Sequence, residues 1–350
     1  MRIAILPGDG IGREVTDQAV KALEAAGRKF GHSFDLQEFP VGWAAIDEHG
    51  KALPDFVHQA CRQRDAVFLG AVGLPDRDPT LPQAERPERA ALLTLRVGNW
   101  ANLRPVWLPP CMTPAGGKVV DILIIRELGG GIYTSEPRGR EEKEGVPSAF
   151  DTLRYSVPEI RRIGKLAYEA SRHRRKMVCS VDKANVLSSM ALWRETMEEL
   201  SKEFPDVQTR HQYVDSAAPL MVQKPDSLDV LVTGNMFGDI LSDLGGALVG
   251  SLGMLPSACI GGPMGLYEPA HGSAPDIMGQ DKANPIASIL SIGMMLQHTF
   301  SLHEEARAIH DAVEAVLIDG FRTIDIASDN CKTIGCSEFG DRVVAKLEEA

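Results

Sequence analysis

The stretch R-I-A-I-L-P-G-D-G-I-G at residues 2–12 sets a pattern that the rest of the chain repeats. Residues 2–6 are apolar enough for a buried strand, and the apolar residues Val15, Ala19 and Leu23 then recur at helical spacing. The glycines between strand and helix either approach a phosphate or simply form a tight turn, because their spacing fits neither G-x-G-x-x-G nor a P-loop. This stretch therefore predicts a strand, a loop and a helix in that order.

Further strands and helices alternate along the chain. The sequence predicts strands at 66–70, 120–125, 177–181 and 228–232, and helices at 54–63, 158–173 and 189–202. It predicts loops at 74–89 and 105–118 and a charged loop at 138–147. Alternation of this kind is typical of an α/β protein, and 350 residues are enough for two domains.

Composition excludes several classes of function. The 37 basic and 48 acidic residues give a net charge of −11, which argues against binding to nucleic acid or to an anionic membrane surface. No apolar run approaches the roughly 18 residues of a membrane span, and the N-terminus lacks the pattern of a signal peptide. The six cysteines are scattered and are interpreted as buried, reduced thiols, so we expect a cytoplasmic location.

The apolar run V-L-V-T-G-N-M-F-G-D-I-L-S-D-L-G-G at 230–246 carries two carboxylates, Asp239 and Asp243. The pattern predicts a strand, a turn, and a helix with Asn235 as its N-cap that runs through Leu244 and ends at Gly245. The two aspartates then share one helix face. They are either solvated acids or ligands of a divalent cation, and their oxygen atoms favour Mg²⁺ or Mn²⁺ over zinc.

Basic residues lie near several predicted strand ends. Arg96 and Arg104 fall in a predicted extended segment, and Arg126 follows a strand. Each arginine taken alone is typical of an exposed surface cation. Together the three could bind a dicarboxylate through bidentate pairs. Lys183 follows another strand, where a lysine can act as a base, and Tyr133 lies in the segment after Arg126.

Several long motifs resemble the isocitrate/isopropylmalate dehydrogenase family of β-hydroxyacid oxidative decarboxylases, nearly from end to end. They are L-P-G-D-G-I-G (6–12), G-A-V-G (70–73), R-P-E…L-L-T-L-R (86–96), A-N-L-R-P (101–105), R-E-L-G-G-G-I-Y…E-P-R-G (126–139), S-V-D-K-A-N-V-L (180–187), H-Q-Y-V-D (211–215), T-G-N-M-F-G-D-I-L-S-D (233–243) and E-P-A-H-G-S-A-P-D-I (268–277).

The resemblance implies a role for each matching residue. The carboxylates of a malate would be bound by Arg96, Arg104 and Arg126, with Asp215 also at the substrate, and the alkyl group by Glu88, Leu92 and Leu93. Asp239, Asp243 and Asp215 from a partner subunit would bind the metal, and Tyr133 and Lys183, the latter also from the partner, would be the acid–base pair. The dinucleotide site would be formed by Ile11, Gly73, Glu88, Glu268, His271, Gly272, Ser273, Ala274, Asp276 and Asn284.

The resemblance also implies an architecture. It is a two-domain, non-Rossmann α/β fold with the active site in the cleft between the domains. A discontinuous dinucleotide-binding domain would comprise 1–98 and 250–350, and a substrate and dimerisation domain 99–249, with an inter-subunit arm near 127–156. The chain would then work as a homodimer with shared active sites, on a small molecule and with neither nucleic acid nor membrane as partner.

The implied reaction is the metal-dependent oxidative decarboxylation of (2R,3S)-3-isopropylmalate to 4-methyl-2-oxopentanoate in leucine biosynthesis. NAD is expected rather than NADP, since Asp276 would repel a 2′-phosphate. Two departures from the family lie near the alkyl pocket: the segment V-G-N-W-A at 97–101 is short, and Trp100 replaces a phenylalanine. The alternatives are therefore another 3-alkylmalate or 3-arylalkylmalate as substrate, or a non-catalytic homologue. A metal-dependent phosphohydrolase is disfavoured, because no phosphate-binding lysine motif accompanies the two aspartates in this sequence.

Overall fold

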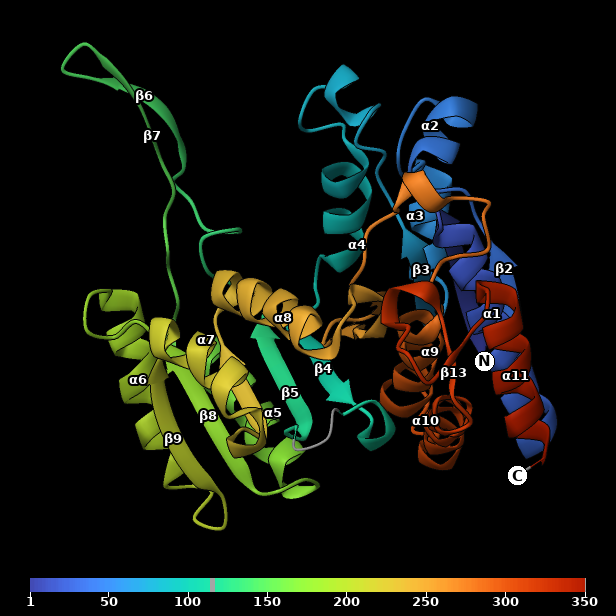
Figure 1. Ribbon diagram of the computed structural model, residues 1–350. Helices are drawn as coiled ribbons and strands as arrows, with labels where there is room; N and C mark the ends of the chain where they lie inside the picture. Colours follow the sequence, from blue (N-terminus) through green and yellow to red (C-terminus); the bar gives the residue numbers. More distant parts are fainter. Residues whose placement is uncertain (114–116, 350) are drawn as a thin grey trace. The chain divides into compact units, whose positions relative to one another are not determined.

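The computed structural model describes residues 1–113 and 117–349 and divides into two compact units. Unit 1 comprises Met1–Asn99, Pro109–Pro114 and Val249–Ala350, and unit 2 comprises Trp100–Leu108 and Ala115–Leu248. In each unit, helices pack against hydrogen-bonded strands (Figure 1). The mixed α/β class predicted from the alternating pattern is thus confirmed.

Besides the short pair β13 (Phe321–Arg322) and β14 (Lys332–Thr333), the described part of unit 1 contains five strands in the order β2 (Asp35–Glu38), β1 (Arg2–Gly8), β3 (Ala66–Ala71), β12 (Gly265–Pro269) and β11 (Pro256–Ile260). All neighbours are parallel except the β12–β11 pair. Its longer helices are α1 (Gly12–Phe30), α3 (Asp55–Arg62), α9 (Ile286–His298), α10 (His303–Ile318) and α11 (Cys336–Glu349), beside the short α2 (Trp43–His49). The α9 helix is apolar on nearly all sides because α1, α10 and the sheet cover it.

Unit 2 contains the strands β4 (Ala101–Leu108), β5 (Val120–Glu127), β10 (Val230–Thr233), β8 (Met177–Asp182) and β9 (Gln208–Tyr213), in that order. β4 is antiparallel to β5, and the remaining neighbours are parallel. Its helices are α5 (Val157–Arg172), α6 (Ser188–Ser201), α7 (Val214–Gln223) and α8 (Asn235–Val249). The five predicted strands and the predicted helices are therefore confirmed to within a few residues.

Four local predictions were wrong. α8 continues past Gly245 to Val249, because that glycine serves close packing: a Cβ there would lie 2.5 Å from Val106 Cγ2. Arg96 ends the short helix α4 (Thr94–Arg96) instead of lying in an extended segment. The charged segment 138–147 is largely a hairpin, and the predicted loop at 105–118 includes strand residues of β4 and also residues 114–116, which lie outside the described residues.

That hairpin consists of β6 (Gly139–Lys143) and β7 (Val146–Phe150), paired antiparallel. Figure 1 shows it as a two-stranded ribbon that extends away from the sheet and helices of unit 2. Nearly all its side chains are exposed, including Val146 at 62% and Phe150 at 40%. An isolated hairpin of this kind is marginally stable in water, so its apolar side chains favour a covered state.

All six cysteines are free thiols in the part of the chain that is described, as expected. Four are buried, but Cys111 is exposed and Cys331 is half-buried, so the expectation of uniform burial was wrong for these two. Burial raises the pKa of Cys61 to about 12, which keeps that thiol protonated. Across residues 1–113 and 117–349, no helix is both long and apolar enough to cross a membrane.

The buried carboxylate of Asp229 connects the strands of unit 2 just before β10 begins. Its oxygens accept hydrogen bonds from Arg174 Nε at 2.7 Å and from the backbone N–H of Arg175 at 2.9 Å. Arg174 also donates to Asp121 at 2.7 Å. One carboxylate thus satisfies a cation and a backbone donor that would otherwise be buried without it.

We expect Asp229→Ala to lower the free energy of unfolding by about 3 kcal/mol, because the partly buried Arg174 guanidinium loses one of its two carboxylate partners and the Arg175 N–H loses its acceptor. Urea denaturation followed by circular dichroism measures this loss. Asp206→Ala is the control, since Asp206 forms an exposed pair with Arg172 and should leave the midpoint nearly unchanged. Equal midpoints for the two variants would contradict the role assigned to Asp229.

Candidate active site

The parallel strands of unit 2 bring several predicted site residues to one edge of the sheet. Arg126 on β5 is in register with Thr233 on β10, and Thr233 with Val181 on β8. α8 follows β10, Lys183 follows β8, and Asp215 lies in the first turn of α7, directly after β9. The carboxyl ends of parallel strands are where α/β proteins place their ligand sites.

Asp239 on α8 is the centre of the first group at this edge. One of its oxygens pairs with Arg126 Nη1, and the other accepts a hydrogen bond from Tyr133 Oη at 3.3 Å. Arg126 is buried, whereas the side chain of Asp239 is 36% exposed. The structure thus joins one predicted metal ligand to a predicted substrate arginine and to the predicted acid.

Asp243, one turn further along α8, faces the second buried arginine. Arg104 Nη1 lies 3.8 Å from Asp243 Oδ1, while Arg104 Nε donates to Asn102 Oδ1 at 2.9 Å. Arg104 Nη1 also lies at 3.5 Å from Ser242 Oγ. The Asp243 side chain itself is 62% exposed in the single chain, although the sequence around it is apolar.

The charges around Asp239 and Asp243 are suited to binding a cation and to keeping Tyr133 protonated as a proton donor. Burial raises the pKa of Tyr133, and the nearby charge of Asp239 raises it further, so the phenol stays protonated at neutral pH. Burial also raises the pKa of Asp243, opposed by Arg104 and increased by Asp239. Two carboxylates one turn apart, each balanced by one arginine, offer oxygen ligands of the type that Mg²⁺ and Mn²⁺ prefer.

Lys183 and Asp215 form the second group of the same edge. Lys183 Nζ donates to Asp215 Oδ1 at 2.7 Å, and this bond lowers the pKa of Asp215. The lysine also lies 5.8 Å from the centre of the Tyr213 ring. The pair therefore joins the predicted base to the predicted third metal ligand within one chain.

In unit 1, three predicted dinucleotide residues meet at the carboxyl ends of β1 and β3, where Gly8 is in register with Ala71. The Ile11 N–H donates to the Ser273 carbonyl at 2.7 Å, and Ser273 Oγ donates to the Gly73 carbonyl. Gly10, at φ +59°, fits closely here, since a Cβ would lie 1.9 Å from Ser273 O. β2 and β3 lie on opposite sides of β1, so this is a switch point of the sheet.

The remaining dinucleotide candidates surround that point. Ala274 packs against the cluster that contains Ile11, and Gly272 and Asp276 are exposed. Burial lowers the pKa of His271, whose Nδ1 lies 2.8 Å from Gly272 O. Its Nε2 is buried and has no protein partner among the described residues. Asn284 is buried and donates to Asp325 at 3.0 Å.

Arg96 and Glu268 contact each other although sequence analysis placed them at different ligands. Arg96 Nε and Nη2 donate to Glu268 Oε1 at 3.0 and 2.5 Å. The three candidates for the alkyl pocket lie on one irregular helix, η2 (Glu88–Leu93), with Glu88 and Leu93 exposed and Leu92 half-buried. A Cβ on Gly73 would lie 3.6 Å from Glu88 Cγ, so Glu88 borders the dinucleotide residues.

Several polar residues around Arg104 and Arg126 are not among those predicted from the sequence. Asn102 and Ser242 contact Arg104, and Asn235 contacts Arg126. Asn235 is the first residue of α8 and not the N-cap before it, so that prediction was wrong. Buried Glu127 accepts the N–H groups of Gly129 and Gly130 at 2.8 Å each. The available signal was a polar residue inside an apolar run, which is consistent with many roles.

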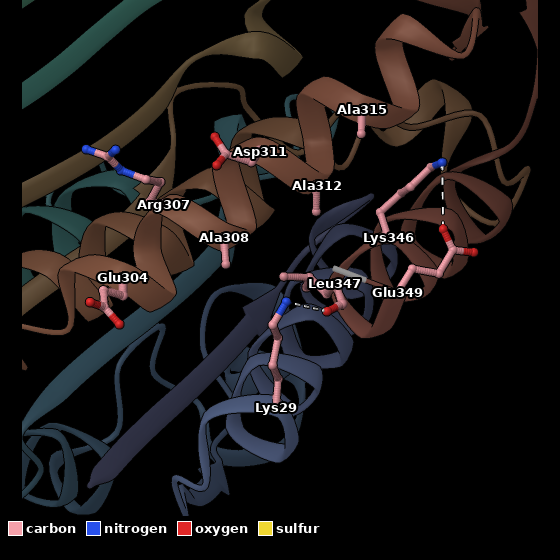
Figure 2. A pocket seen from close by; sticks show the side chains of 10 residues that line it. All are labelled: Lys29, Glu304, Arg307, Ala308, Asp311, Ala312, Ala315, Lys346, Leu347 and Glu349. Carbon is pink, nitrogen blue, oxygen red and sulfur yellow. Dashed lines mark hydrogen bonds and ion pairs between the residues drawn. The ribbon is translucent and has the colours of Figure 1, made fainter.

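A depression of about 610 Å³ on unit 1 is lined by residues other than those predicted for the site (Figure 2). Basic and acidic side chains alternate around it, and two of them are already engaged: Lys29 donates to Leu347 O at 3.0 Å, and Lys346 lies 3.8 Å from Glu349. Asp311 also belongs to a half-exposed group with His310 and Glu314. These groups balance one another in charge, and none of the predicted site residues lies there.

Comparisons with known proteins agree with this arrangement. The model of the isocitrate/isopropylmalate dehydrogenase family matches residues 2–343. The 3-isopropylmalate dehydrogenase of Gloeobacter violaceus is 50% identical over 358 residues, covering 100% of this chain and 99% of that protein. That of Moorella thermoacetica is 51% identical over 356 residues and 99% of each chain.

Solved structures extend the comparison to the fold. The isocitrate dehydrogenase from Methylococcus capsulatus has a TM-score of 0.87 at 33% identity and covers 99% of both chains. A β-decarboxylating dehydrogenase from Thermococcus kodakarensis has a TM-score of 0.81 at 31% identity, covering 99% of this chain and 96% of that one. Full-length identity, fold and motif positions agree, and the chain belongs to the isocitrate/isopropylmalate dehydrogenase family.

Proposed function

We propose that this protein catalyses the oxidative decarboxylation of 3-isopropylmalate with reduction of NAD, a step of leucine biosynthesis. The observation that carries the proposal is the bonding of Asp239 to both Arg126 and Tyr133, which unites a cation ligand, a carboxylate-binding group and an acid. Relatives named 3-isopropylmalate dehydrogenase, half identical over the full length, support the choice of substrate.

The arginines are assigned to the substrate carboxylates. Arg104 and Arg126 are buried but oriented by neutral side chains, Asn102 and Asn235, so that each keeps a corner toward an aspartate of α8. A planar guanidinium held in this way is prepared for bidentate binding of a carboxylate. Arg96 of unit 1 is assigned the same role, and it would exchange its bond with Glu268 for the substrate.

Asp239 and Asp243, with Asp215, are assigned to the divalent cation. Bound Mg²⁺ or Mn²⁺ would lower the pKa of the substrate 2-hydroxyl and polarise the ketone formed from it. Bound NAD would accept the hydride, and the buried, unpartnered Nε2 of His271 provides a polar atom suited to a ligand in unit 1. The exposed carboxylate of Asp276 would accept ribose hydroxyls and repel a 2′-phosphate.

Proton transfer is assigned to Lys183 and Tyr133. Lys183 would remove the proton of the 2-hydroxyl, directly or through a relay. Tyr133 would donate its phenolic proton to the carbon that loses the carboxyl group. The raised pKa of Tyr133 supports that direction, because the proton to be donated is present throughout the neutral range.

We propose further that the protein is a homodimer with shared active sites. The exposed β6–β7 hairpin with Val146 and Phe150 provides strand edges and apolar side chains for a second copy. The exposed side chain of Ile240, between the two aspartates of α8, favours cover from the same source. Lys183 and Asp215 of one chain would then serve the Asp239 group of the other.

The substrate assignment predicts a rank order. In an assay of NAD⁺ reduction with Mn²⁺, we expect 3-isopropylmalate to give the highest kcat/KM among 3-isopropylmalate, malate, isocitrate and bulkier 3-substituted malates. NADP⁺ should be a poorer acceptor, and omission of the metal should abolish turnover. A bulkier malate that reacts fastest would redirect the proposal to that substrate, and a metal-independent reaction would refute the assigned chemistry.

Replacing the acid predicts a kinetic defect without a binding defect. Tyr133→Phe should lower kcat by about a hundredfold or more, because a positioned proton donor is lost, while the Kd of NAD⁺ is retained. Tyr168→Phe is the matched control, since Tyr168 packs against Phe204 and its hydroxyl contacts Thr209. An active Tyr133→Phe enzyme would remove Tyr133 from the mechanism.

Shared sites predict complementation between two inactive variants. Lys183→Ala and Asp239→Asn should each abolish turnover alone. Random association of the two chains gives about half heterodimers, each with one intact site, so about a quarter of wild-type activity should return. Restored activity after co-expression, measured by NADH absorbance, supports the dimer. Continued inactivity of the purified mixed dimer would place both residues in one chain's site.

A further inference from the structure

Asn235 occupies the junction between the strand edge and the helix that carries both aspartates. It is the first residue of α8, is 3% exposed, and follows β10, whose Thr233 is in register with Arg126. We propose that Asn235 is a positioning residue: it fixes the direction of the Arg126 guanidinium and ties it to the loop that leads to Tyr133. This inference rests on the function proposed above for those two residues.

The side-chain oxygen of Asn235 holds one edge of the guanidinium. Asn235 Oδ1 accepts hydrogen bonds from Arg126 Nε at 3.0 Å and Nη2 at 2.9 Å. Because the five donors of a guanidinium lie in one rigid plane, fixing these two sets the direction of Nη1. That corner faces Asp239.

The side-chain nitrogen of the same amide holds the adjoining loop. Asn235 Nδ2 lies 3.4 Å from the Leu128 carbonyl and 3.3 Å from the Gly130 carbonyl, so it donates toward the chain between Arg126 and Tyr133. Rotating the amide by 180° would oppose its N–H groups to those of the arginine and its oxygen to the two carbonyls. The surroundings therefore determine its orientation.

Backbone packing supports the same arrangement from the other side. A Cβ on Gly238, in the first turn of α8, would lie 2.7 Å from Arg126 Cβ, so the arginine lies directly against the helix. The Asn235 backbone N–H is satisfied separately by Tyr155 Oη at 2.7 Å. Support of the helix start and orientation of Arg126 thus depend on different atoms, which can be removed one at a time.

Two variants separate these roles. Asn235→Ala removes the acceptor of Arg126 and the donor to the loop, while Tyr155→Phe removes only the acceptor of the backbone N–H and keeps the ring packed against Trp193. Asn235→Ala should raise the KM for 3-isopropylmalate about tenfold or more, as expected for loss of hydrogen bonds to a charged group. The Kd of NAD⁺ should stay within about twofold of wild type in both variants.

A purely structural role gives a different result. It would lower the number of active molecules, and hence the apparent kcat, without changing KM. Tyr155→Phe should follow this pattern, with a lower melting temperature and a KM close to that of wild type. An equal KM in Asn235→Ala and Tyr155→Phe would overturn the proposal.

Crystal structures of the two variants provide a readout that is independent of activity. The Arg126 guanidinium should turn away from its wild-type direction in Asn235→Ala and keep that direction in Tyr155→Phe. An unchanged Arg126 in Asn235→Ala would overturn the proposal. If the wild-type enzyme did not oxidise any 3-substituted malate, the proposed function would fail, and the position of Arg126 in these structures would still decide the role of Asn235.

Discussion

The pairing of Asp239 with the buried cation Arg126 is the interaction on which the candidate site of unit 2 depends. A buried guanidinium requires a partner, and the partner here is a carboxylate at the start of a helix that immediately follows a strand. The strand register brings β5 and β10 together, so the arginine and the aspartate meet although they are 113 residues apart. The strand register thus places the charged side chains at one edge of the sheet, and the side-chain amides of Asn102 and Asn235 orient the two guanidinium groups.

Unit 1 uses the carboxyl ends of its own parallel strands in the same way. Hydrogen bonds of Ser273 to Ile11 and Gly73 stand where unit 2 has ion pairs. The buried Nε2 of His271, without a protein partner among the described residues, is a polar atom that the proposed dinucleotide would engage. The pair formed by Arg96 and Glu268 joins a residue assigned to the substrate with one assigned to the cofactor. Each unit therefore contains a pre-formed set of polar and charged groups at the carboxyl ends of its parallel strands.

Strand and helix positions could be predicted because apolar periodicity is a local property, and the runs at 2–6, 66–70 and 177–181 express it clearly. The end of α8 could not, because Gly245 resembles a helix stop and only the strand packed against it reveals its role. The role of Gly129 could not be predicted either, because only the structure shows that a Cβ there would lie 3.0 Å from both Arg162 Nη2 and Glu127 Oε1. Recognition of motifs predicted which residues form the candidate site, whereas the hydrogen bonds of Asn235 could be seen only in the three-dimensional structure.

We propose that Asp239 and Asp243 hold a divalent cation in a site that a second chain completes. The measurement that tests it most directly is the crystal structure of the protein with Mn²⁺ and 3-isopropylmalate, with the ion located by its anomalous scattering. We expect Mn²⁺ to be bound by Asp239 and Asp243 of one chain and Asp215 of the other, with Arg126 on a substrate carboxylate. An ion bound elsewhere, or one completed by Asp215 of the same chain, would contradict it.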